Sequence, residues 1–243
     1  MKIFAHRGAS GQFPENSRLA FENAIKQGAD GIELDVQFHL ESQRFIALHD
    51  QILDTATSGT GDFNQYSLPE LCKMRLGQGQ TILTLDEALA CINGKVLVNI
   101  EVKSTETDPT LLTSLCYALN TAIQEAITHY AFTVEHFIIS SSNHTLLSFF
   151  NVVYPEYKLA ALIAHMPVDE CKFTEKLPVQ LVNQDIESLS PSLVEDAHAR
   201  QLQEFVYTVN RYEELEKCHL ANVDGIFTNY PEKTRNLAQL CIE

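Results

Sequence analysis

Several features that assign a chain to a class at a glance are missing from this one. Its 243 residues contain no pair of cysteines in the spacing CxxC, and no apolar run approaches the roughly 18 residues that span a bilayer. No linker rich in proline, glycine or serine divides the chain, and no internal repeat is visible. These absences argue against a structural zinc site, a membrane anchor and a repeat protein, and they predict one domain over residues 1–243.

Basic residues are scarce, since 17 lysines and arginines stand against 32 aspartates and glutamates, for a formal net charge of −15 at pH 7. An acidic surface argues against nucleic acid, whose phosphates need lysine and arginine to neutralise them. A small anionic substrate stays compatible with this charge if a metal ion and a few local cations reverse the field at the site. We therefore expect a small-molecule substrate, no nucleic acid, and a monomer or a homodimer.

The six cysteines stand at positions 72, 91, 116, 171, 218 and 241, far apart in the chain and beside apolar residues such as Leu71 and Leu115. We expect them to be buried thiols that stay reduced. A strand at 2–5 brings His6 to the start of the chain, which leaves no room for a cleavable leader. Both observations predict a cytoplasmic protein.

Short β-rich runs alternate with helical patterns along most of the chain. The nine candidate strands are 2–6, 31–37, 45–49, 96–102, 136–141, 158–164, 179–183, 204–209 and 224–228. Strands that alternate with helices indicate a parallel sheet, and the length of the chain is normal for an α/β barrel. An eight-stranded barrel needs one strand fewer, so one candidate is surplus, and the sequence does not show which.

The spacing of apolar residues predicts helices at 17–27, 85–92, 111–127 and 192–201. The second of these begins with a capping box, because Glu87 follows Thr84 after three positions. The segment 50–95 breaks the alternation, since its first part is polar and rich in threonine and glycine, with only a helical turn near 68–74. We interpret that first part as an insertion over the mouth of the barrel.

Five short polar motifs, each at the end of a β-like run, carry the chemistry. They are AHRG at 5–8, ELDV at 33–36, LHD at 48–50, NIEVK at 99–103 and YTVN at 207–210. Together they supply two histidines, three carboxylates, an arginine and a lysine. This combination is typical of metal-assisted cleavage of a phosphate ester.

Three carboxylates form the candidate metal site. Glu33 and Asp35 are two residues apart on one strand, so both side chains point the same way, and Glu101 comes from a later strand. A site made of oxygen ligands suits Mg²⁺ or Ca²⁺. Inward-facing carboxylates in a barrel would repel one another without a cation.

Two histidines, His6 and His49, each follow an apolar run and stand beside a charged residue. Histidine titrates near neutral pH. One of the two can therefore serve as general base and the other as general acid, and the sequence does not assign them.

Two cations accompany these groups. Arg7 can grip a phosphate with its planar guanidinium. Lys103 lies two residues past Glu101 on the same strand face, where it either contacts the substrate or pairs with a carboxylate. Glu15 and Asn16 stand just before the first expected helix, where structural capping and substrate contact are both open.

In these motifs and in their order, the chain resembles the glycerophosphodiester phosphodiesterase family over nearly its whole length. The matching segments are 6–8, 14–17, 28–37, 49–50, 99–103, 207–210 and 223–228. The resemblance implies a TIM (β/α)8 barrel with a small insertion after the third strand, at approximately 50–95, and a site at the carboxyl ends of the strands. It also implies an enzyme that hydrolyses glycerophosphodiesters, such as glycerophosphocholine or glycerophosphoethanolamine, to glycerol 3-phosphate and an alcohol.

The resemblance carries roles onto individual residues as well. It implies that a divalent metal, Mg²⁺ or Ca²⁺, is bound by Glu33, Asp35 and Glu101. It implies acid–base catalysis by the two histidines, and phosphate contacts from Arg7 and Lys103.

Several positions depart from the pattern of that family, although none removes a metal ligand or a catalytic histidine. Tyr207 stands where tryptophan is common, and Asn229 stands where aspartate is common after the last strand. The segments 41–44, 55–57 and 140–142 also differ from the usual sequences. These differences bear on substrate preference more than on activity.

Two alternatives stay open. A lysophospholipase D or a phospholipase C-like lyase on the same barrel would accept an acyl chain or stop at a cyclic product. A non-catalytic relative would bind a glycerophosphodiester or a metal without turnover.

Overall fold

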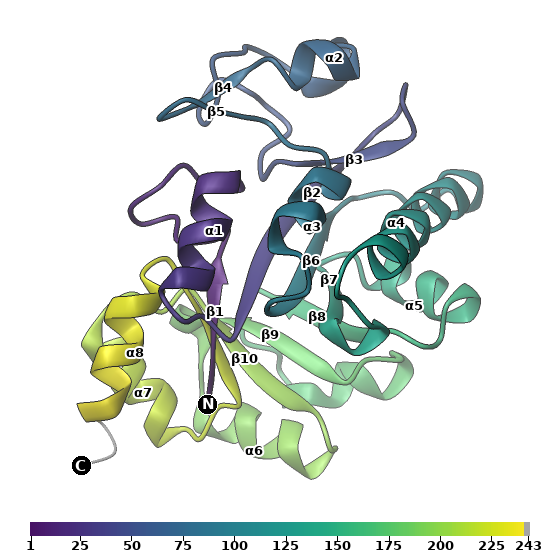
Figure 1. Ribbon diagram of the computed structural model, residues 1–243. Coiled ribbons are helices and arrows are strands. Elements are labelled where there is room, and N and C mark those ends of the chain that lie inside the picture. The colour runs from purple at the N-terminus through teal and green to yellow at the C-terminus, as the bar shows by residue number, and fades with distance from the viewer. Residues whose placement is uncertain (241–243) are drawn as a thin grey trace.

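The computed structural model describes residues 1–240, in which parallel strands close into a barrel surrounded by helices (Figure 1). The barrel strands are β1 (Lys2–His6), β2 (Gly31–His39), β6 (Leu97–Lys103), β7 (Phe137–Ser141), β8 (Lys158–Ile163), β9 (Leu181–Asp185), β10 (Gln203–Tyr207) and β11 (Gly225–Thr228). Strand β1 pairs in parallel with both β11 and β2, which closes the sheet. The predicted TIM-type barrel is confirmed.

The surplus strand among the nine candidates is the one predicted at 45–49. It forms β3 (Arg44–Ala47), which pairs antiparallel with the outer end of β2, with Val36 opposite Ala47. Only four residues separate β2 from β3, and a connection this short makes a hairpin, because a parallel neighbour needs a crossover of a dozen residues or more. Strand β3 therefore extends β2 beyond the barrel wall.

Helices follow most of the barrel strands and pack on their outer faces (Figure 1). They are α1 (Arg18–Lys26), α3 (Leu85–Ile92), α4 (Pro109–His129), α5 (His144–Val153), α6 (Pro191–Ala199), α7 (Tyr212–Leu220) and α8 (Pro231–Leu240). The predicted capping box is present, since Thr84 Oγ1 accepts from the Glu87 amide and a Glu87 carboxylate oxygen accepts from the Thr84 amide. Across residues 1–240, no helix combines the length and the apolar character that a membrane crossing needs.

The segment between β3 and α3 forms a small substructure of its own, drawn at the top of Figure 1. It contains η1 (Phe63–Gln65), α2 (Leu68–Leu71) and the hairpin strands β4 (Arg75–Gly77) and β5 (Gln80–Thr81). Phe63 and Leu71 pack with Ile46 of β3 in a separate apolar cluster. Helix α3 packs on the barrel, so the substructure ends before α3 and not at residue 95, the approximate limit that the sequence predicts. That the whole chain forms one domain stays a prediction.

The inside of the barrel is an apolar floor beneath a polar layer. Phe4, Phe205 and Phe227 meet edge-on or tilted, with ring centroids 5.5–5.9 Å apart, and all three are buried. Gly31 makes room for this floor, because an added Cβ would lie 2.2 Å from the Phe4 ring. Because strand side chains alternate between faces, the residues two positions further along each strand also point inward, above the floor.

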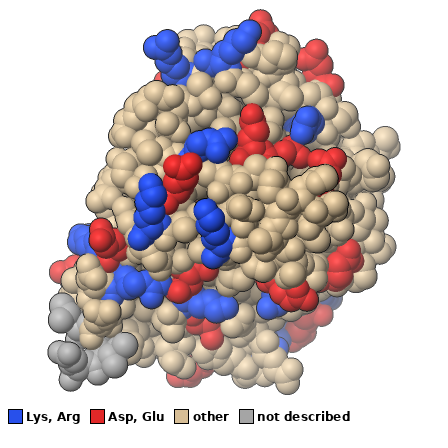
Figure 2. All heavy atoms as spheres, in the orientation of Figure 1, with Lys and Arg blue, Asp and Glu red and all other residues tan. Residues whose placement is uncertain are grey.

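Within residues 1–240, four of the five cysteines are buried, as the sequence predicts: Cys91, Cys116, Cys171 and Cys218. Cys72 is only partly buried, and none of the five forms a disulfide. The sixth, Cys241, lies outside the described residues. Acidic and basic side chains are mixed over the face shown in Figure 2, with no continuous basic surface there.

Candidate active site

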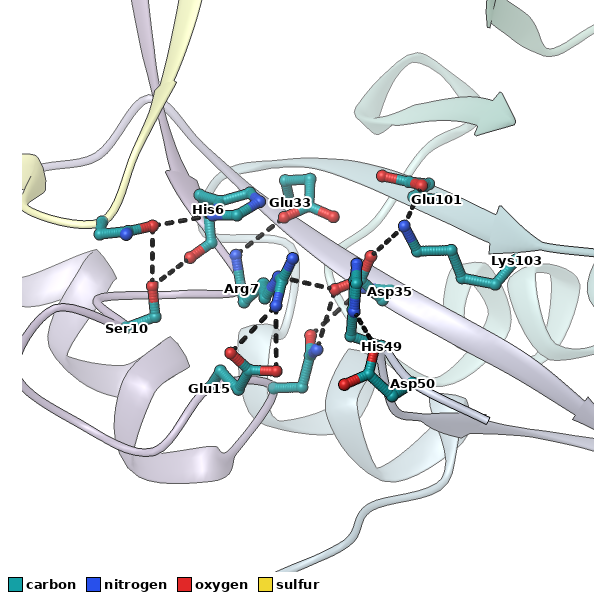
Figure 3. Close-up of polar contacts among 12 residues, drawn as sticks. His6, Arg7, Ser10, Glu15, Glu33, Asp35, His49, Asp50, Glu101 and Lys103 are labelled. Carbon is teal, nitrogen blue, oxygen red and sulfur yellow. Dashed lines mark hydrogen bonds and ion pairs between the residues drawn. The ribbon is translucent and has the colours of Figure 1, made fainter. Parts of the chain in front are cut away.

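The polar layer opens into a cavity of about 240 Å³. Of the seven residues predicted for the site, six line this cavity: His6, Arg7, Glu33, His49, Glu101 and Lys103. The seventh, Asp35, is buried beside them (Figure 3). The structure thus brings together side chains that are almost 100 positions apart in the chain.

The three carboxylates come from two adjacent strands. Glu33 and Asp35 lie on β2 and Glu101 on β6, where Asp35 and Glu101 are direct neighbours in the parallel register. All three are buried, and one potential ligand atom from each lies within 4.8 Å of the others. Glu33 Oε1 has no hydrogen-bond partner among residues 1–240, so it has a free lone pair to offer an ion.

Asp35 is the most heavily contacted member of this cluster. Its Oδ2 lies 3.0 Å from Arg7 Nε, and its Oδ1 lies 3.3 Å from Lys103 Nζ. Asn16 donates from Nδ2 to Asp35 Oδ2 at 3.1 Å, and its Oδ1 accepts from the Asp35 amide at 3.2 Å. Burial alone would raise the pKa of Asp35, but Arg7 and Lys103 bring it below the ordinary value. The sequence left the role of Asn16 open, and here it fixes a carboxylate.

Arg7 is held by acids on three sides. Its amide donates to Glu33 Oε2 at 2.8 Å, and its Nη1 contacts both carboxylate oxygens of Glu15 at 3.0 and 3.1 Å. Its Nε meets Asp35, as above. Glu15 therefore holds Arg7, whereas the cap of α1 is the hydroxyl of Ser17.

Lys103 follows Glu101 on the same face of β6, as its spacing predicts. Its Nζ contacts the Glu101 carboxylate and Asp35, and it lines the cavity at the same time. Burial lowers the pKa of Lys103, but the neighbouring Asp35 and Glu101 raise it overall. The lysine therefore stays protonated.

The charges of the cluster are not balanced by these two cations. Burial is the main reason why the pKa of Glu33 lies well above its ordinary value, and the negative charges of Asp35 and Glu101 add to it. The pKa of Glu101 is raised for the same reasons, burial first and Asp35 second. A divalent cation among the three carboxylates would remove this repulsion, and oxygen ligands alone favour Mg²⁺ or Ca²⁺.

His6 is oriented by a residue from the other end of the chain. Its Nδ1 lies 2.8 Å from Asn229 Oδ1, so Nδ1 carries the proton and Nε2 is the free nitrogen. Ser10 donates to the His6 carbonyl at 2.7 Å. Burial, assisted by the positive charge of Arg7, lowers the pKa of His6 to about 4, so this ring is neutral at pH 7.

His49 follows β3 and faces the cluster from the insertion side. Its Nδ1 lies 2.7 Å from Asp50 Oδ1, and its carbonyl accepts from Gln37 Nε2 at 2.8 Å. Its side chain is 31% exposed, so it is more accessible than His6. The two histidines therefore differ in both their partner and their access to solvent.

The sequence motifs did not predict a second wall of the cavity. It consists of Leu162 on β8, Asn183 and Asp185 on β9, and Tyr207 on β10. Only Tyr207 belonged to a motif noted in the sequence. The spacing of two between Asn183 and Asp185 is the same signal that identified Glu33 and Asp35, but the predicted strand ended at 183.

The comparisons with known proteins agree with one another. The model of the glycerophosphoryl diester phosphodiesterase family matches residues 6–233. A glycerophosphodiester phosphodiesterase of Caldanaerobacter subterraneus subsp. tengcongensis is 34% identical over 245 residues, which covers 98% of this chain and 97% of the relative.

Solved structures show the same similarity. An Oleispira antarctica phosphodiesterase, in complex with the product sn-glycerol-3-phosphate, superposes with a TM-score of 0.88 at 25% identity, covering 98% of this chain and 97% of that one. The fold of a putative glycerophosphoryl diester phosphodiesterase from Silicibacter pomeroyi is also alike, with a TM-score of 0.89 at 19% identity and coverage of 98% and 93%.

Proposed function

Because the chain belongs to the glycerophosphoryl diester phosphodiesterase family, we propose that it hydrolyses glycerophosphodiesters to glycerol 3-phosphate and an alcohol. The observation that carries this proposal is the cluster of Glu33, Asp35 and Glu101 in one cavity with two histidines. The Oleispira relative was solved with sn-glycerol-3-phosphate as its product, which supports the same product here.

Three carboxylates would hold the divalent metal, Mg²⁺ or Ca²⁺. The unpartnered Oε1 of Glu33 and the all-oxygen donor set fit such an ion, and so do the raised pKa values of Glu33 and Glu101. When bound, the ion supplies a Lewis acid for a phosphoryl oxygen and a template for a hydroxyl group.

Arg7 and Lys103 offset the negative charge of the phosphate as it grows in the transition state. Their carboxylate partners hold both cations in place before the substrate arrives. The two side chains therefore lose little conformational entropy when the substrate binds. Glu15 and Asn16 position other residues of the site: Glu15 holds the Arg7 guanidinium, and Asn16 holds the Asp35 carboxylate.

The environments of the two histidines favour different roles. His6 is neutral at pH 7, and Asn229 leaves its Nε2 as an acceptor, so it takes the proton of the nucleophile. The Asp50 carboxylate lies 2.7 Å from His49 Nδ1 and orients the ring, and His49 takes the remaining role, the donation of a proton to the leaving alkoxide. Two nucleophiles fit this arrangement, namely water and the glycerol 2-hydroxyl, and the second gives a cyclic phosphate that is hydrolysed afterwards.

The first experiment measures glycerol 3-phosphate release by metal-stripped protein with and without added Mg²⁺ or Ca²⁺. Glycerophosphocholine and glycerophosphoethanolamine serve as substrates, and Glu33→Ala is compared with Glu195→Ala, which removes an exposed glutamate of α6. We expect metal-dependent release that Glu33→Ala loses and Glu195→Ala keeps. Binding of substrate without release in either metal would replace this proposal by a non-catalytic binding protein.

Two additions to the assay address the alternatives. Lysophosphatidylcholine tests for a lysophospholipase D, and phosphorus NMR of the reaction detects a cyclic phosphate as intermediate or final product. A faster reaction with lysophosphatidylcholine, or a cyclic end product, would contradict the proposed hydrolysis of glycerophosphodiesters.

We also propose a cytoplasmic location and a monomeric or homodimeric state, in keeping with the free thiols among residues 1–240. Cell fractionation tests the first, and light scattering of the purified protein tests the second.

A further inference from the structure

The wall of Leu162, Asn183, Asp185 and Tyr207 has no part in the mechanism above. It lies on strands β8, β9 and β10, whereas the carboxylate cluster lies on β2 and β6 across the barrel. Leu181 belongs to the apolar floor, so Asn183 and Asp185 rise from it toward the mouth on the same face of β9. Arg7 and Lys103 line the same cavity as this wall, so a substrate whose phosphate meets these two cations has room for one of its two alcohol groups on the side of the wall.

Asn183 presents an unsatisfied acceptor within the cavity. Its Nδ2 lies 3.5 Å from Asn99 Oδ1, and Asn99 Nδ2 donates to Ser140 Oγ at 2.8 Å. These contacts use the Asn183 amide nitrogen only. Its Oδ1 has no hydrogen-bond partner among residues 1–240, although Asn183 is only 1% exposed. Buried acceptors are nearly always satisfied, so a ligand that carries a donor is expected here.

Asp185 supplies a negative charge beside this acceptor. Its Oδ1 accepts from the Glu187 amide at 2.8 Å, and no lysine, arginine or histidine in the described part of the chain forms an ion pair with it. The two cations that line the cavity, Arg7 and Lys103, are paired with acids of the opposite half. The second carboxylate oxygen of Asp185 is therefore available to a cationic ligand.

Tyr207 places an aromatic ring next to this carboxylate. Its hydroxyl donates to the Ile163 carbonyl at 2.9 Å, which fixes the ring in the wall. Tyr207 and Asp185 are direct neighbours in the parallel register of β10 and β9. Burial raises the pKa of the Tyr207 phenol, and the negative charges of Asp185 and Glu101 add to this. An aromatic face beside a carboxylate is a typical environment for an organic ammonium ion.

We propose that Asn183, Asp185 and Tyr207 select substrates whose leaving alcohol carries a primary ammonium group, as in glycerophosphoethanolamine. This inference rests on the proposed hydrolysis of glycerophosphodiesters. The N–H donors of a primary ammonium satisfy both Asn183 Oδ1 and the Asp185 carboxylate, while Tyr207 and Leu162 pack against the methylene groups. A quaternary ammonium has no N–H for Asn183, and an uncharged alcohol has no charge for Asp185.

The test compares kcat/KM for glycerophosphoethanolamine, glycerophosphocholine and glycerophosphoglycerol. The variant Asp185→Asn removes the charge but keeps an oxygen that can accept from the Glu187 amide, so the local fold is preserved. We expect it to lower kcat/KM for glycerophosphoethanolamine by about 10- to 100-fold, which is typical for a charged hydrogen bond, and for glycerophosphoglycerol by less than about threefold. The matched control is Glu187→Gln, which changes an exposed acid two residues away. This variant should leave kcat/KM unchanged for all three substrates.

A second variant separates the two polar groups. Asn183→Ala should reduce the preference for glycerophosphoethanolamine over glycerophosphocholine, because only the primary ammonium gives Asn183 a hydrogen bond. Asp185→Asn should weaken both cationic substrates relative to glycerophosphoglycerol. Equal losses on all three substrates in both variants would mean that the two residues are merely structural, and would overturn the inference.

The wild-type enzyme distinguishes this inference from the proposal beneath it. Release of glycerol 3-phosphate from all three substrates at similar kcat/KM would overturn the inference and leave the proposed function intact. No release from any of them, with either metal, would overturn both.

Discussion

Glu204 on β10 is a buried carboxylic acid, and its replacement by an apolar residue should stabilise the protein. The side chain is fully buried, and neither carboxylate oxygen has a hydrogen-bond partner among residues 1–240. Its neighbour Phe205 points into the barrel floor, so Glu204 points to the helix-covered outside. Burial, with the negative charge of Asp224 as a second cause, raises the pKa of Glu204 well above its ordinary value of 4.5.

The raised pKa fixes the sign of the pH dependence. Below pH 4.5 the group is protonated in both the folded and the unfolded chain, so it contributes no difference. Above that pH the unfolded chain ionises, while the folded one keeps its proton until the pH reaches its raised pKa. Each pH unit within that interval costs about 1.4 kcal/mol of folding free energy.

The substitution Glu204→Met keeps the length of the side chain and removes the ionisable group. We expect the free energy of unfolding of this variant, relative to the wild type, to be larger at pH 7.5 than at pH 5, with a slope of up to about 1.4 kcal/mol per pH unit while the folded carboxyl keeps its proton. Urea unfolding at both pH values measures it. The control is Gln184→Met, since Gln184 is equally buried on the same outer side of the neighbouring strand but carries no charge.

The control variant should differ from the wild type by the same amount at both pH values. A difference between Glu204→Met and the wild type that does not change with pH would refute the reasoning. It would mean that the Glu204 carboxyl ionises in the folded protein with its ordinary pKa.

Two further predictions concern the site. His6→Ala and His49→Ala should each lower kcat by about 10²- to 10⁴-fold if these histidines move protons, and steady-state kinetics with losses under threefold for both would contradict that role. Asn16→Ala should raise the metal concentration for half-maximal activity by about 10-fold, because it releases Asp35 from two hydrogen bonds. The matched control is Asn23→Ala on α1, because within residues 1–240 the Asn23 side chain binds the Leu19 carbonyl and no site residue. An equal shift in this variant would contradict the prediction.

Short-range patterns in the sequence were sufficient for much of the architecture. The alternation of apolar runs with amphipathic segments predicted the barrel strands and several helices, because hydrophobic periodicity is set by local backbone geometry. The spacing of two between Glu33 and Asp35, and between Glu101 and Lys103, placed each pair on one face of its strand for the same reason.

Contacts between distant segments were decided only by the tertiary structure. The sequence contained nine strand candidates, but the pairing of β2 with β3 showed which one lies outside the barrel. Asn229 reaches His6 across 223 positions because β11 closes the sheet against β1, and Asp185 faces the carboxylate cluster because β9 lies across the barrel from β2. Local periodicity determines which face of a strand a side chain occupies, whereas its partner on that face depends on how the whole sheet closes.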